Sequence, residues 1–214
     1  MMRRVAPIVV SCLAIALASP SARADDCAAS VQAAFEKQRT QASYRLSSKQ
    51  QTDDGTIETQ RDYVAPDRMY NKIVVPGQPA PLETIAVGRW AWANQGSGWQ
   101  ELQPQFAQSV TFEVSNALQT PVEVKGEFVC LGKVTRDGKD YVGFRTVSQP
   151  AQTKPGEKAI ARTVLVDSAT GLPAHNDVGE ADTTVPPIIA TVYTYPADLA
   201  VEAPLDALPA GKPQ

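Results

Sequence analysis

Residues 83–102, ETIAVGRWAWANQGSGWQEL, contain all three tryptophans of the chain. Positions 85, 87, 89 and 91 alternate with positions 86, 88, 90 and 92, which is the period-two pattern of a β-strand. The five residues NQGSG at 94–98 favour a turn and Trp99 begins a segment that returns, so the sequence predicts a β-hairpin with a five-residue loop. Trp90 and Trp92 are two apart and therefore share one face. Their rings either pack in the core, where aromatic residues supply much of the packing energy, or line a cavity for an apolar ligand.

The N-terminus has the pattern of a secretory signal peptide over residues 1–24. Arg3 and Arg4 give it a charged start, an apolar run follows, and the tripeptide ARA at 22–24 is an A-x-A cleavage site. The apolar run is too short to span a bilayer comfortably, and no second run approaches its length. We therefore expect a periplasmic protein whose mature form has no integral membrane segment.

Removal of this segment takes away Arg3, Arg4 and Arg23 and leaves 17 basic against 23 acidic side chains, a net charge of about −6. An acidic chain of this kind is a poor partner for nucleic acid or for an anionic membrane surface. About 190 residues remain, which is enough for one well-filled core. We expect a single domain over residues 25–202 and a flexible tail over residues 203–214, which are rich in proline and alanine.

Two segments carry helical patterns. Residues 25–40 place Val31, Ala34 and Phe35 in a narrow apolar stripe, which is typical of a helix that lies on a sheet. Residues 104–118 fit a helix through apolar positions 106, 110, 114 and 117, or a strand through positions 110, 112 and 114. Prolines at 104 and 121 bracket the second segment, which favours the helix.

The remaining segments alternate as antiparallel strands. The expected strands cover residues 43–52, 56–64, 67–75, 127–135, 139–148, 157–166, 172–180 and 187–195. Asp54-Gly55 and Asp137-Gly138 are strong signals for tight hairpin turns. Roughly ten consecutive strands must curl to bury one face. The sequence thus predicts an α+β fold, mainly antiparallel β: a curved meander that forms an incomplete barrel, covered by the N-terminal helix and, if residues 104–118 are helical, by a second helix.

This order of elements resembles the LolA/LolB-like fold of exported bacterial proteins, which includes the lipoprotein carriers, LppX-type lipid carriers and RseB-type sensors. The motifs that carry the resemblance are Ala65-Pro-Asp-Arg68 at the start of a strand, Ile85-Ala-Val-Gly88 ahead of the tryptophans, Gly98-Trp99, and the turn VDSATGLP at 166–173. In that turn we expect Asp167 to cap the backbone, Gly171 to take positive φ and Pro173 to begin a strand.

The resemblance implies the fold and a class of apolar cargo, without naming the cargo. One departure concerns Ala65, because the lipoprotein carriers usually have a basic residue just before the proline that opens this strand. If that basic group helps to close the pocket of the carriers, this chain must close its own pocket in another way.

The sequence lacks the motifs of catalysis and metal binding. His175 is the only histidine, no serine lies in a nucleophile elbow, and one histidine beside two cysteines that are expected to be oxidised leaves too few ligands for zinc. Phosphate-binding glycine loops are also missing. We therefore expect no enzyme, no cofactor and no metal, and we interpret His175 as an ordinary exposed strand residue.

The function that fits these observations is non-enzymatic binding of a hydrophobic ligand, an acyl chain, a lipid or a lipidated protein, in the hollow of the half-barrel. The alternative is an envelope protein–protein interaction or sensor module with a filled core. The candidate lining residues are Trp90, Trp92, Trp99, Met69, Ile73, Tyr63, Phe106 and Arg68. For Arg68 the sequence allows either an anchor for an anionic head group or a strand-end salt bridge. The oligomeric state stays open.

Cys27 and Cys130 are the two cysteines outside residues 1–24. Two cysteines in an exported chain most often form one disulfide. Cys27 falls in the first turn of the expected N-terminal helix and Cys130 in an apolar strand, so a helix that covers the sheet brings them together. Two unpaired thiols, or a bridge between two chains, are the alternatives.

Overall fold

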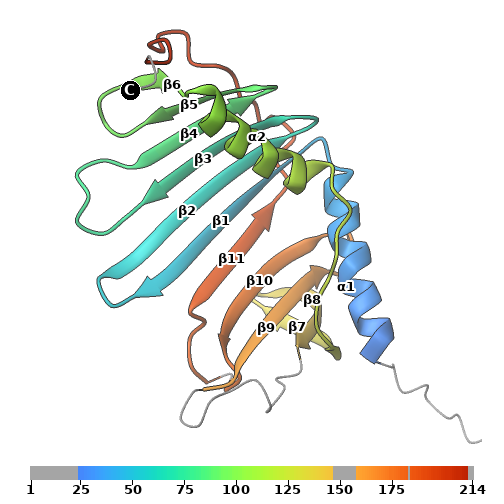
Figure 1. The fold of residues 1–214 in the computed structure, drawn as a ribbon. Helices are drawn as coiled ribbons and strands as arrows, with labels where there is room; N and C mark the ends of the chain where they lie inside the picture. The colour runs from blue at the N-terminus through green and yellow to red at the C-terminus, as the bar shows by residue number, and fades with distance from the viewer. Residues whose placement is uncertain (1–23, 147–157, 183, 212–214) are drawn as a thin grey trace, which may run out of the picture.

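The computed structural model describes residues 24–146, 158–182 and 184–211, so the expected signal peptide lies outside the described residues except for Ala24. Two helices, α1 (Ala24–Arg39) and α2 (Pro104–Leu118), accompany one sheet (Figure 1). Its strands are β1 (Ser43–Thr52), β2 (Gly55–Val64), β3 (Arg68–Val74), β4 (Leu82–Val87), β5 (Trp90–Asn94), β6 (Trp99–Glu101), β7 (Phe128–Arg136), β8 (Lys139–Thr146), β9 (Ile160–Asp167), β10 (Pro173–Glu180) and β11 (Ile189–Thr194).

The eleven strands form a single sheet in the order β6-β5-β4-β3-β2-β1-β11-β10-β9-β8-β7. Every neighbouring pair is antiparallel, and β6 and β7 are the two unjoined ends. Two local meanders, β1–β6 and β7–β11, therefore meet where β1 pairs with β11. The prediction of a curved antiparallel meander that does not close is confirmed, and residues 104–118 are a helix.

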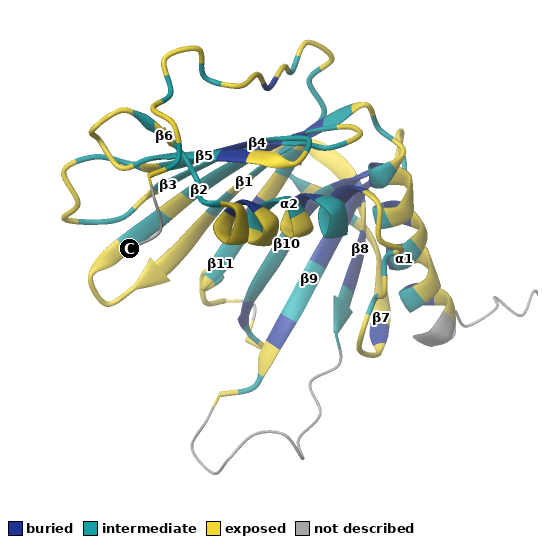
Figure 2. Cartoon of the chain, turned by 45° about the horizontal axis from the view of Figure 1, so that its top comes forward, coloured by how far each residue is buried: buried dark blue, intermediate teal, exposed yellow. Residues whose placement is uncertain are grey.

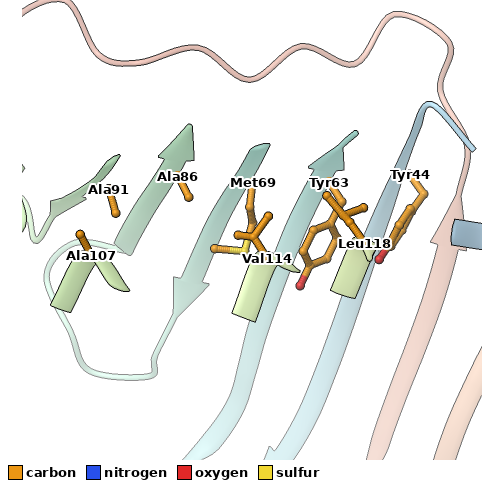
Figure 3. Close-up of a cluster of buried hydrophobic side chains, with 8 residues drawn as sticks. All are labelled: Tyr44, Tyr63, Met69, Ala86, Ala91, Ala107, Val114 and Leu118. Atoms are coloured by element: carbon orange, nitrogen blue, oxygen red, sulfur yellow. The ribbon is translucent and has the colours of Figure 1, made fainter. Parts of the chain in front are cut away.

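Both helices pack on one face of the sheet, which we call the inner face; the opposite face is the outer face. Under α2, buried side chains of the helix meet those of β1–β5: Ala107, Val114 and Leu118 lie against Tyr44, Tyr63, Met69, Ala86 and Ala91 (Figure 3). Under α1, residues Cys27, Val31 and Ala34 lie against Phe128, Phe144, Val164 and Val166. Each helix thus covers one half of the same face.

The predicted disulfide is confirmed. Cys27 in α1 is bonded to Cys130 in β7, with 5.4 Å between the two Cα atoms, which lie 103 positions apart in the sequence. Cys130 shares the inner face with its partner Phe144 of β8. The bond therefore fastens α1 to the end of the sheet that it covers.

The tryptophan-rich stretch forms three strands, so the single strand predicted through Gly88 is wrong. Gly88 takes φ +61°, the left-handed conformation that glycine adopts without strain, and the chain reverses there. Val87 then pairs with Trp90, and Ala86 pairs with Ala91. Because positions 87 and 90 pair across this turn, the inward positions change from even to odd numbers, and Ala86 and Ala91 share the inner face. The second half of the prediction, a return through NQGSG into β6, is confirmed.

Part of the segment expected to be a flexible tail is tied to the edge strand β6. The backbone N–H of Leu208 donates to Trp99 O at 2.9 Å, and Glu101 N–H donates to Leu208 O at 2.8 Å. Before it reaches this edge, the segment after β11 runs back along the sheet (Figures 1 and 2) and buries Val201. An unpaired three-residue edge strand exposes backbone donors and acceptors, and this segment covers them.

Candidate ligand-binding site

A hollow of about 240 Å³ lies on the inner face between the two helices. Its third wall is the connection from α2 to β7, of which residues 122–124 line the space; Figure 1 shows this connection running from the end of α2 down along α1. Four aromatic side chains line it: Phe35, Tyr44, Tyr63 and Tyr193. Leu46, Ala117, Val122 and Val124 add aliphatic surface.

The aromatic wall is built by pairs across the sheet and across the helix–sheet contact. Tyr44 and Tyr63 are directly paired on β1 and β2, and their ring centroids are 5.0 Å apart. Phe35 of α1 meets Tyr193 edge-on at 5.9 Å. Burial raises the pKa of the Tyr63 and Tyr193 phenols, so both stay neutral at physiological pH. The aromatic part of the wall is therefore uncharged.

Two arginines reach the hollow from different elements. Arg39, the last residue of α1, donates to the carbonyl oxygens of Asn116, at 2.7 Å, and Thr120. Arg162 of β9 donates from Nε to Asn176 Oδ1 at 2.7 Å, and its Cζ lies 5.4 Å from the centroid of the Phe35 ring. Glu123, the one acidic residue of the wall, has a side chain that is 79% exposed.

The structure places three of the predicted lining residues on the inner face. Tyr63 lines the hollow itself. Met69 is 2% exposed and packs beneath α2 as part of the filled core, and Ile73, on the same face of β3, is half-buried outside that core.

Phe106 is not among the residues that face the sheet, because its side chain is 57% exposed (Figure 2 shows the exposed side of α2). Ala107 takes the inward position instead. The small side chains of Ala86 and Ala91 face Ala107 across this contact and allow the helix to lie close to the sheet, which leaves no room for a phenyl ring.

The three tryptophans share the outer face, as the register of β5 and β6 requires. Trp90 is 47% exposed and carries the Arg89 guanidinium over its ring at 4.7 Å. It also lines a separate groove of about 440 Å³ at the end of its strand, against the first half of α2. Trp92 and Trp99 are half-buried. The structure therefore does not bring the tryptophans to the hollow between the helices.

Arg68 also points to the outer face, since it is paired with Val87 and Val64. Its Nη1 donates to Val201 O at 2.9 Å. It thus holds the C-terminal segment against the sheet, and in this arrangement it serves neither of the two roles that the sequence suggested.

His175 is only 8% exposed, so the interpretation as an exposed strand residue is wrong. Its ring meets Tyr141 edge-on on the outer face, and its Nδ1 has no hydrogen-bond partner within the described residues. Burial lowers the pKa of His175, and the nearby cation of Arg136 lowers it further.

Neither helix of the described chain has the length and apolar content needed to span a bilayer, and the same residues hold no group of three metal-ligating side chains.

Arg162 and Phe35 are the features of the hollow that sequence reasoning did not single out. The sequence places Phe35 in the apolar stripe of the N-terminal helix, but it does not predict the contact of Phe35 with Tyr193. Arg162 had a usable signal, because it is an arginine inside the otherwise apolar strand IARTVLV at 160–166. Charged residues are almost never fully buried unless they are paired, so an arginine in such a strand indicates a polar contact or a binding site.

LprF and LppX are two of the solved structures that share this architecture. LprF from Mycobacterium bovis is 9% identical in sequence and superposes with a TM-score of 0.55 over 86% of this chain and 99% of its own. The lipoprotein LppX from Mycobacterium tuberculosis is 12% identical, with a TM-score of 0.52 over 83% of this chain and 99% of its own. No protein-family model matches the sequence, and no curated protein matches it.

These neighbours define the class of the protein as an open antiparallel half-barrel with helices on its inner face. The chain shares the fold of LprF and LppX, so the resemblance read from the motifs is confirmed at the level of the fold.

Proposed function

We propose that the protein binds a hydrophobic ligand without catalysis, in the periplasm, and that the ligand is an acyl chain, a lipid or the lipid group of a lipidated protein. The observation that carries the proposal is the aromatic hollow between α1, α2 and the inner face. An apolar chain that enters this space gains about 25 cal/mol for each Å² removed from water.

The size of the hollow limits what it holds in this conformation. At about 240 Å³ it is smaller than most small-molecule sites, which range from roughly 300 to 1,000 Å³. It accommodates one short apolar segment. A longer chain requires residues 122–124 to move away from the sheet, and this wall belongs to a connection without helix or strand.

The second candidate is an envelope protein–protein interaction or sensor module. It is favoured by Phe106 and Phe112, which are 57% and 66% exposed on α2, and by the filled core below that helix. In this alternative the sheet only supports an outer binding surface.

The test fills the hollow from within. Ala117 is half-buried on α2 and lines the hollow, so Ala117→Leu adds three carbon atoms to the space. Ala33→Leu, at an exposed position of α1, is the matched control. We expect Ala117→Leu to weaken the binding of a fluorescent fatty-acid probe at least about fivefold, because overfilling costs about 1–3 kcal/mol, and Ala33→Leu to leave it unchanged.

Native mass spectrometry of protein purified from cells separates the two candidates. A co-purified lipid that Ala117→Leu removes supports the ligand-binding function. Equal probe binding by both variants together with a bare protein mass would reject it in favour of the interaction module.

A further inference from the structure

Arg162 occupies an unusual position for a guanidinium group. It lies in the middle of β9, points to the inner face, and borders the hollow between the helices. Within the described residues no carboxylate lies within 4.0 Å of it, whereas Arg45, Arg61 and Arg136 each have such a partner. Arg162 is half-buried, so its charge is partly removed from water without a carboxylate to balance it; this costs free energy, and arginine does not lose its proton to avoid the cost.

The contacts of Arg162 use only part of its binding capacity. Nε donates to Asn176 Oδ1, and Cζ lies over the Phe35 ring, 5.4 Å from its centroid. The two terminal nitrogens, Nη1 and Nη2, donate no hydrogen bond to the residues that the structure describes. The Asn176 contact and the ring fix the orientation of the guanidinium, which leaves its bidentate edge available.

We infer that Arg162 binds the anionic group of the ligand, so that the hollow selects an anionic amphiphile, a carboxylate or phosphate attached to an acyl chain. This inference rests on the proposed hydrophobic site. A free anion fits the surroundings poorly, because Phe35, Tyr193 and Leu46 line the same space and prefer an apolar chain beside the charge. Burial lowers the pKa of Arg162, which agrees with a site poor in water.

The test compares ligands that differ only in charge. Dodecanoate and dodecyl phosphate are the anionic probes, dodecanol is the neutral probe, and inorganic phosphate is the anion without a chain. Affinities are measured by calorimetry on the native protein, on Arg162→Met, on Arg162→Lys, and on Arg89→Gln, an arginine substitution in the exposed turn after Gly88.

We expect the native protein to bind dodecanoate about ten- to a hundredfold more tightly than dodecanol, since a hydrogen-bonded charge contributes about 1.5–3 kcal/mol. Arg162→Met should lose this preference and keep its affinity for dodecanol, Arg162→Lys should keep part of the preference, and Arg89→Gln should behave like the native protein.

Equal binding of dodecanoate and dodecanol would overturn the role of Arg162 and leave the hydrophobic site standing. A preference that survives Arg162→Met would also overturn it. Inorganic phosphate that binds as tightly as dodecyl phosphate would assign the site to a free anion. If no chain-bearing probe binds, the proposed function fails and the inference fails with it.

Discussion

Arg39 Nη1 lies 2.7 Å from the carbonyl oxygen of Asn116, so the last residue of α1 caps the last turn of α2. The same guanidinium also reaches Thr120 O in the connection that follows. Carbonyl groups at a helix C-terminus lack intrahelical partners and carry partial negative charge. An arginine donates hydrogen bonds to them and balances this charge. The two helices that enclose the hollow are thus joined at one point.

Replacing this arginine should loosen the end of α2. We expect Arg39→Met, which keeps the apolar stem, to lower the free energy of unfolding by about 1–2 kcal/mol, because hydrogen bonds from a charged group contribute amounts of this size. Amide hydrogen exchange at residues 117–120 should accelerate more than exchange in β1. Arg89→Met, in an exposed turn, serves as the control; identical exchange rates in the two variants would contradict the cap.

Met69 and Ile73 lie on the same face of β3 but differ in how far they are buried. Met69 is 2% exposed beneath α2, and Ile73 is half-buried outside the core cluster under that helix. Met69→Ala should therefore lower the free energy of unfolding by about 2–5 kcal/mol, the usual range for a core truncation, and Ile73→Ala by less than half as much. Urea denaturation of both variants measures the difference. Equal losses would show that α2 does not seal the core at Met69.

Trp90 should not contribute to ligand binding if the ligand occupies the hollow between the helices. We expect Trp90→Ala to leave the affinity for a fatty-acid probe within about twofold, whereas Leu46→Ala, which removes three carbon atoms from the hollow, should weaken it about tenfold. Fluorescence titration of both variants gives the comparison. The reverse order of effects would place the ligand in the groove beside Trp90 instead.

The bond between Cys27 and Cys130 closes a loop of about a hundred residues. The chain-entropy model assigns about 4–5 kcal/mol to a crosslink of this length. We expect the double variant Cys27→Ser/Cys130→Ser to lose an amount of this order, measured by urea denaturation. Mass analysis after alkylation of the unfolded, unreduced native protein should find no free thiol at either position; two alkylated thiols, or the mass of a linked dimer, would contradict the bond.

His175 makes stability depend on pH in a definite direction. Its folded-state pKa is lowered, first by burial and then by Arg136, so the unfolded chain binds more protons between that value and the ordinary value of about 6.5. The free energy of unfolding should therefore fall as the pH drops from about 7 to about 5. His175→Gln should flatten this part of the profile. An unchanged slope in the variant would assign the pH dependence to other groups.

The turns were predictable from the sequence because their chemistry is local. Asp167 Oδ1 accepts hydrogen bonds from the N–H groups of Ala169 and Thr170, and Gly171 takes φ +67°, as the VDSATGLP motif predicts. Strand positions followed from the same short-range signals. The Gly88 reversal was not predicted because residues 85–92 also fit one continuous strand, although the turn moves the inward positions from even to odd numbers, from Ala86 to Ala91.

The site was less predictable because it depends on contacts between distant parts of the chain. Phe35, Tyr63, Tyr193 and Arg162 come from four elements, and only the pairing of β1 with β11 brings them together. The one-residue shift from Phe106 to Ala107 on α2 has a similar origin, since the alanines on the facing strands determine which side of the helix turns inward.

The pairing of β1 with β11 also bears on how the chain is made. Leu46 meets Tyr193, so β1, which is made early in synthesis, finds its second neighbour only in β11, the last strand in chain order within the described residues. Until the six residues of β11 have been made, the edges of β1 and β10 both present unpaired backbone groups. Contacts between residues so far apart in sequence also form slowly. During this delay a nascent chain is most exposed to strand exchange with another chain. A chaperone that shields these two edges would therefore protect the protein in the cell.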